Sequence, residues 1–158
     1  MSVSVIARRL TAAAAVATAA VGALALPAAA SGQHSARPHG DVVISSVQYD
    51  APGRDDNSNR SLNKEYVDIT NTTRRSVNLD HWTLTGRDGH RYTFRHFRLE
   101  GRATVRVHTG VGRDNAKDVY QDRRHEAWDN FADTATLRND RNRVVDQVTW
   151  GRHRGGRH

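Results

Sequence analysis

ATVRVHT, residues 103–109, alternates apolar and polar side chains along its whole length. Val105 and Val107 fall on one phase of this stretch, and Arg106 and His108 fall on the other. Successive side chains of a strand point to opposite faces, so this period of two predicts a β-strand with the valines directed inward. Arg106 and His108 are then expected on the outer face.

The same pattern recurs on both sides of this stretch. Residues 65–70 (EYVDIT) place Val67 and Ile69 on one face. Five further short apolar runs, each bounded by turn-forming residues, lie at 42–49, 82–85, 91–94, 134–138 and 144–150. No segment carries a sustained apolar stripe with the 3.6-residue period of a major helix. Seven short strands with regular turn signals predict an all-β fold, an antiparallel β-sandwich.

The first 30 residues have the layout of a secretory signal peptide. Arg8 and Arg9 precede an uncharged stretch at 10–26, and Ala28-Ala29-Ala30 offers a cleavage site before Ser31. A membrane-spanning helix needs about 20 predominantly apolar residues, and this stretch is shorter and largely alanine. We therefore expect cleavage after residue 30, a secreted product, and no membrane span after cleavage.

The remaining chain divides into a domain with two polar ends. Residues 31–40 (SGQHSARPHG) predict a flexible linker, residues 151–158 (GRHRGGRH) a basic flexible tail, and residues 41–150 the folded domain. The sequence contains no cysteine, which excludes disulfides, Cys-ligated zinc, iron–sulfur clusters and a thiol nucleophile. A domain of about 110 residues is large enough to be held together by its hydrophobic core alone.

The formal net charge of +7 belongs mainly to the ends of the chain. The leader carries two of these charges, residues 32–40 carry one and the tail carries three, which leaves residues 41–150 at +1. Nucleic-acid-binding domains usually present a basic face, so these totals argue against a dedicated DNA-binding fold. Arg152, Arg154 and Arg157 of the tail are weak candidates for contact with a polyanion.

Several short blocks, in the same order and spacing, resemble one known family. The blocks are EYVDITN (65–71), LDHWTL (79–84), YTF (92–94), LEG (99–101), VRVHTG (105–110), WDN (128–130), DTATLRN (133–139) and VVD (144–146). Across residues 41–150 the chain resembles a bacterial lamin tail domain. The family usually has glycine near positions 81 and 141, where this chain has His81 and Arg141.

The resemblance implies an immunoglobulin-like β-sandwich, of the kind found in nuclear lamins and in many exported bacterial proteins. It also implies a binding or tethering module without catalytic activity. Lamin tails contact proteins and DNA, but those contacts do not carry over to particular residues of this chain. Fold alone does not settle function.

A polar loop near residues 55–59 is a weak candidate for calcium binding. Asp55, Asn57 and Asn59 recur at every second residue, with Glu65 further along, and such oxygen-bearing loops can ligate Ca²⁺. The helix–loop–helix calcium pattern fails here, because Arg60 stands where glycine is required. The alternative is a solvated turn, in which Asp, Asn and Ser bond to their own backbone. Apart from this calcium hypothesis, no cofactor is expected.

The sequence shows no pattern of residues that is typical of a catalytic site. It contains no H-E-x-x-H and no G-x-S-x-G motif, and Gly110-Val111-Gly112 lacks the third glycine of a phosphate-binding loop. His108 is expected to be an ordinary residue on a strand surface. Trp128 follows no strand pattern and is either an exposed aromatic or a plug at one end of the sandwich.

Three functions remain, in order of preference. The first is a secreted binding or structural module that contacts a protein or a cell-envelope polymer and is not an enzyme. The second is an accessory protein that binds DNA or another polyanion through the basic tail and surface arginines. The third is a small hydrolase, which would need a cleft that holds a histidine beside a carboxylate.

Overall fold

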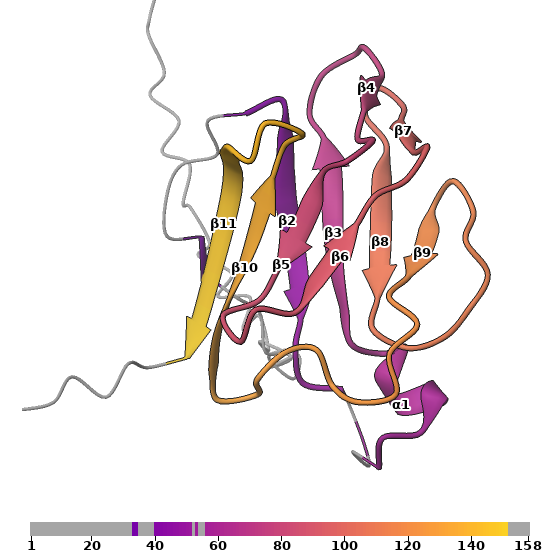
Figure 1. Cartoon of the computed structure of the whole chain (residues 1–158), viewed down its shortest axis with the longest axis vertical. Coiled ribbons are helices and arrows are strands. Elements are labelled where there is room, and N and C mark those ends of the chain that lie inside the picture. The colour runs from indigo at the N-terminus through magenta and orange to yellow at the C-terminus, as the bar shows by residue number, and fades with distance from the viewer. Residues whose placement is uncertain (1–32, 35–39, 52, 54–55, 152–158) are drawn as a thin grey trace, which may run out of the picture.

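The computed structural model describes residues 33–34, 40–51, 53 and 56–151 (Figure 1). The predicted leader, Asp55 and the tail arginines Arg152, Arg154 and Arg157 lie outside these residues. In chain order the elements are β1 (Gln33–His34), β2 (Val42–Gln48), α1 (Asn59–Leu62), β3 (Tyr66–Asn71), β4 (Val77–Asn78), β5 (Thr83–Thr85), β6 (Arg91–Thr93), β7 (Arg98–Leu99), β8 (Thr104–His108), β9 (Asp118–Tyr120), β10 (Ala132–Arg138) and β11 (Val144–Gly151).

Two sheets form the body of the fold, which confirms the predicted β-sandwich. One sheet has the strand order β1-β11-β10-β5-β6, and the other has the order β2-β3-β8-β9. Figure 1 shows the two sheets as layers, with α1 at one end and the small β4–β7 pair at the other. The short strand β1 comes from the stretch predicted as a linker and pairs with β11.

The core lies between the two layers and follows the alternation of the sequence. Val67, Ile69, Val105 and Val107 are all fully buried, as the period-two pattern predicts. Leu137 of the opposite sheet is buried with them. Each such side chain contributes about 1.5–3 kcal/mol when it leaves water. The valines of residues 103–109 therefore do point inward, while Arg106 and His108 are only partly buried on the outer face.

Some local structure differs from the sequence-based expectation. The described residues contain eleven strands rather than seven, because β1, β4, β7 and β9 are only two or three residues long and show no alternation. β9 runs parallel to β8, the one exception to antiparallel pairing among the described strands. A single helical turn, α1, is started by the Ser58 side chain, which accepts a hydrogen bond from the Ser61 backbone N–H.

Two turns take the left-handed backbone conformation near the positions where the family usually has glycine. His81 has a φ of 64° and Asn142 has a φ of 59°. This conformation is costly for a residue with a β-carbon and suits glycine best. At position 81 the turn is therefore kept, although histidine suits its backbone conformation less well than the family's usual glycine. Asn142, beside Arg141, carries the second turn, and asparagine tolerates this conformation better than most residues.

No helix within the described part of the chain has both the length and the apolar character needed to cross a membrane.

Candidate binding site

The α1 end of the sandwich is built from three chain segments that hydrogen bond to one another. The Asn59 side chain donates to the carbonyl oxygen of Val111 at 2.9 Å and accepts from the Val111 N–H. The Asn63 side chain also donates to the Val111 carbonyl oxygen, at 3.0 Å. The third segment joins through backbone bonds from Asp122 to Gly110 and from Arg123 to Thr109. We refer to these segments, together with residues 124–131, as the α1 end.

Glu65 is the buried charged residue at the centre of this end. Its side chain is 2% exposed, and Oε1 accepts backbone hydrogen bonds from Ala127 at 3.0 Å and from Trp128 at 2.8 Å. Burial raises the pKa of the Glu65 carboxyl to about 8, against the opposing effect of the two N–H donors. Glu126 raises the pKa further through its own charge. Glu65 therefore ties the segment before β10 to the start of β3.

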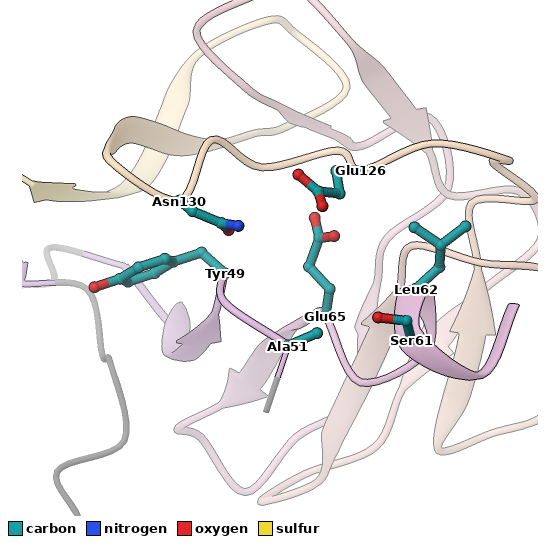
Figure 2. Close-up of a pocket in the computed structure, with 7 residues that line it drawn as sticks. All are labelled: Tyr49, Ala51, Ser61, Leu62, Glu65, Glu126 and Asn130. Carbon is teal, nitrogen blue, oxygen red and sulfur yellow. The ribbon is translucent and has the colours of Figure 1, made fainter. Parts of the chain in front are cut away.

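The crevice around Glu65 is too narrow to be a substrate site. Figure 2 shows Glu65 pointing toward Glu126, with Tyr49 and Asn130 on one side and Leu62 on the other. The crevice has no room for a whole water molecule. Glu65 consequently acts on its surroundings through the two backbone hydrogen bonds that it accepts.

The calcium candidates do not converge in the described structure. Asn57 is exposed, the Asn59 amide is occupied by Val111, and Oε1 of Glu65 is occupied by the two backbone donors. Asp55 lies outside the described residues. Within the described residues no three His, Cys, Asp or Glu side chains gather as metal ligands. Calcium binding stays a prediction that rests on the sequence.

A wider hollow lies beside α1 on the surface of the same end. Its volume is about 370 Å³, and it is lined by Asn57, Asn59, Leu62, Val111, Arg123 and Arg124. We call it the arginine hollow. The sequence pattern does not reveal it, because its walls come from three separate segments. The side-chain bonds of Asn59 to Val111 and the backbone bond of Arg123 to Thr109 bring these segments together.

The aromatic residues of this end divide into a plug and an exposed side chain. Trp128 is 1% exposed and packs edge-on against His90. Of the two predicted alternatives, an exposed aromatic or a plug at one end of the sandwich, it is therefore the plug. Phe131 is 88% exposed. Its backbone N–H donates to Oδ1 of Asp129 at 2.6 Å, and the same oxygen accepts from Ala132. The alternation of the sequence would place Phe131 on the same face as Asp133, which is buried. The turn at Asp129 ends that alternation before β10 begins, so Phe131 is exposed instead.

The opposite end of the sandwich gathers arginines that the sequence separates. The buried Asn71 side chain donates to the carbonyl oxygens of Arg75, Leu99 and Glu100, which holds two loops together. The Arg102 N–H donates to the Thr73 carbonyl oxygen across the same junction. This arrangement brings together four exposed arginines, which we call the arginine corner: Arg74, Arg75, Arg98 and Arg102.

Besides the exposed His81–Asp80 pair, two histidine–carboxylate pairs occur in the described structure. Nδ1 of His90 lies 2.5 Å from Asp88, and Nε2 of His108 lies 3.0 Å from Asp118. The His90 ring is buried against Trp128, and the His108 ring is stacked on Tyr120. Neither histidine lines the Glu65 crevice or the arginine hollow. Neither pair therefore contributes a lining side chain to either opening at the α1 end.

Comparison with known proteins agrees with the fold. The model of the Lamin Tail Domain family matches residues 35–152, which is most of the chain. A search of curated proteins finds no match.

Proposed function

The chain belongs to the lamin tail domain family, and on that premise we propose that it is a secreted, non-catalytic module that binds a protein or a cell-envelope polymer. The leader-like residues 1–30 support export. Of the two partner classes, a protein is favoured by the exposed aromatic residue at the α1 end.

Phe131 is the observation that carries this proposal. A phenylalanine that is 88% exposed leaves a large apolar surface in water, and aromatic side chains are enriched in the cores of protein–protein interfaces. Its backbone is fixed on two sides. Asp129 accepts the Phe131 N–H, and the Phe131 carbonyl lies so close to Gly151 that a β-carbon there would clash with it. A rigid anchor loses little conformational entropy when it binds.

Affinity capture from the producing cell's envelope and medium tests this proposal. The Phe131→Ser variant is expected to lose a protein partner that the wild-type chain retains. The control is Val144→Ser, which removes another exposed apolar side chain, 52% exposed, from the hairpin between β10 and β11. Equal capture by all three chains would contradict a role for Phe131 in binding.

The arginine corner supports a second candidate function, the binding of a polyanion. Backbone contacts place two exposed acids, Asp41 and Glu100, beside the loops that carry its four exposed arginines. This local excess of positive charge is hidden in the near-neutral total of residues 41–150. Arginine binds phosphate groups well because its planar group offers paired donors.

Duplex DNA is a suitable probe of the corner. If four phosphates are contacted, affinity should fall roughly a hundredfold between about 50 and 200 mM salt. Changing all four corner arginines to glutamine should remove most of that dependence. A chain that lacks residues 151–158 separates the corner from the tail: if the deletion alone abolishes binding, the corner is not the site.

A further inference from the structure

The arginine hollow has the size and rigidity of a small-ligand site. Its volume of about 370 Å³ lies within the range of pockets that hold small molecules. Asn59 and Asn63 both bond to Val111, which fixes one wall, and the backbone bond from Arg123 to Thr109 fixes another. A ligand would therefore meet a preformed hollow.

The positive charge of the two arginines that line the hollow is only partly offset by nearby acids. Neither Arg123 nor Arg124 forms an ion pair with an acid of the described residues. Nε of Arg123 is buried and has no hydrogen-bond partner there. Asp88 is near enough to feel the charge of Arg123, so it offsets part of the positive potential. Arginine side chains that line a hollow donate charge-assisted hydrogen bonds to an anion, which are stronger than those between neutral groups.

Two of the other residues that line the hollow, Leu62 and Val111, are apolar. Leu62 is buried beneath the hollow, and Val111 is 47% exposed at its rim. Asn57 adds a polar exposed side chain, whereas the Asn59 amide is already used by Val111. A ligand that fits both kinds of lining residue carries one negative group for the arginines and a carbon chain for Leu62 and Val111.

We propose that the arginine hollow binds a carboxylate joined to an apolar group. A carboxylate fits better than an inorganic anion, because two guanidinium groups partly offset by Asp88 match a single negative charge and the apolar lining residues need a carbon chain. The carboxylate can come from the end of a partner polypeptide or from a free organic acid. This inference does not depend on the contact proposed for Phe131.

Calorimetric titration of the full chain tests the proposal with four probes. They are the peptide acetyl-Gly-Gly-Leu with a free carboxylate, the same peptide with an amide end, 4-methylpentanoate, and inorganic phosphate. We expect the free-carboxylate peptide to bind and the amide to bind at least tenfold more weakly, as the loss of a charge-assisted hydrogen bond requires. If 4-methylpentanoate binds as well as the peptide, the source is a free acid. If the peptide binds better, the source is a chain end.

Variants locate the site. Arg123→Gln and Arg124→Gln should each weaken binding of the free-carboxylate peptide by about tenfold to a hundredfold. Arg143→Gln removes an exposed arginine on the hairpin after β10 and should leave binding unchanged. Thermal unfolding of each variant separates a folding defect from a binding defect. Equal binding of the free and amide peptides, equal effects of all three variants, preference for phosphate, or no binding at about 1 mM peptide would each overturn the proposal.

Discussion

Oε1 of Glu65 accepts a hydrogen bond from the backbone N–H of Trp128 at 2.8 Å, across 63 positions of the chain. This bond joins the start of β3 to the segment that carries both the buried plug, Trp128, and the exposed anchor, Phe131. The α1 end has few strand hydrogen bonds of its own. Its order therefore depends on Glu65 and on the side-chain bonds to Val111.

Removing the Glu65 carboxyl should destabilise the domain strongly. Glu65→Ala leaves the N–H groups of Ala127 and Trp128 buried without acceptors, and we expect the free energy of unfolding to fall by about 2–4 kcal/mol. Urea unfolding measures this change. Glu100→Ala, at an exposed position, should change the free energy by less than about 0.5 kcal/mol. Similar losses in the two variants would mean that the two hydrogen bonds contribute little.

The protonation of Glu65 should make stability depend on pH. The pKa of Glu65 is about 8 in the folded chain and 4.5 in an ordinary environment, so between these values the folded chain binds the proton more tightly. This contribution to stability is fully present below pH 4.5 and is lost as the pH rises to 8, at roughly 1.4 kcal/mol per pH unit.

Glu65→Gln isolates that dependence, because an amide oxygen still accepts both hydrogen bonds but does not titrate. The wild-type chain should lose stability relative to Glu65→Gln between pH 5 and 8, which is measured by urea unfolding at several pH values. A constant difference between the two chains across this range would contradict a raised pKa at Glu65.

The sequence predicts the long strands well because alternation is a local signal. Val67, Ile69, Val105 and Val107 are buried as the pattern requires. Glu65 shares the phase of Val67 and Ile69, so the same signal places it inward. Its carboxylate nevertheless suggested a calcium ligand, because the backbone donors of Ala127 and Trp128 are more than 60 residues away in the chain.

Features that need distant segments were not predictable in this way. The arginine corner depends on Asn71, whose side chain bonds to carbonyl oxygens 28 and 29 residues further along. The two-residue strands β4 and β7 are too short to show a period and form only because their segments are brought together. Phe131 lies in a turn just before β10, where its backbone N–H donates to the Asp129 carboxylate.

His81→Gly should stabilise the domain. His81 holds a φ of 64°, which costs a residue with a β-carbon but not glycine. Nε2 of His81 lies 3.5 Å from the Asp80 carboxylate, but the His81 side chain is largely exposed, so this contact contributes little to stability. Glycine also raises the conformational entropy of the unfolded chain, which opposes this effect. We expect the free energy of unfolding to rise by a net amount of about 0.5–1 kcal/mol. His81→Ala keeps the β-carbon and should bring no gain in thermal unfolding, so an equal effect of Gly and Ala would exclude backbone strain as the cause.

Export should be visible at the N-terminus of the mature chain. If residues 1–30 are a signal peptide, the protein recovered from the medium begins at Ser31, which intact-mass and N-terminal peptide measurements detect. Changing Ala28 and Ala30 to bulky residues should block this cleavage. Recovery of a chain that still begins at Met1, from the cell interior alone, would refute export.

Site-specific photo-crosslinking tests the central claim, that this lamin tail domain binds a protein through its α1 end, most directly. A photoreactive phenylalanine analogue is placed at position 131 and, in a second chain, at position 144, both exposed apolar positions of the folded domain. We predict a single crosslinked protein partner from position 131, reduced by excess wild-type chain but not by Phe131→Ser. The same set of crosslinks from both positions, or competition by wild-type and Phe131→Ser chains alike, would contradict the claim.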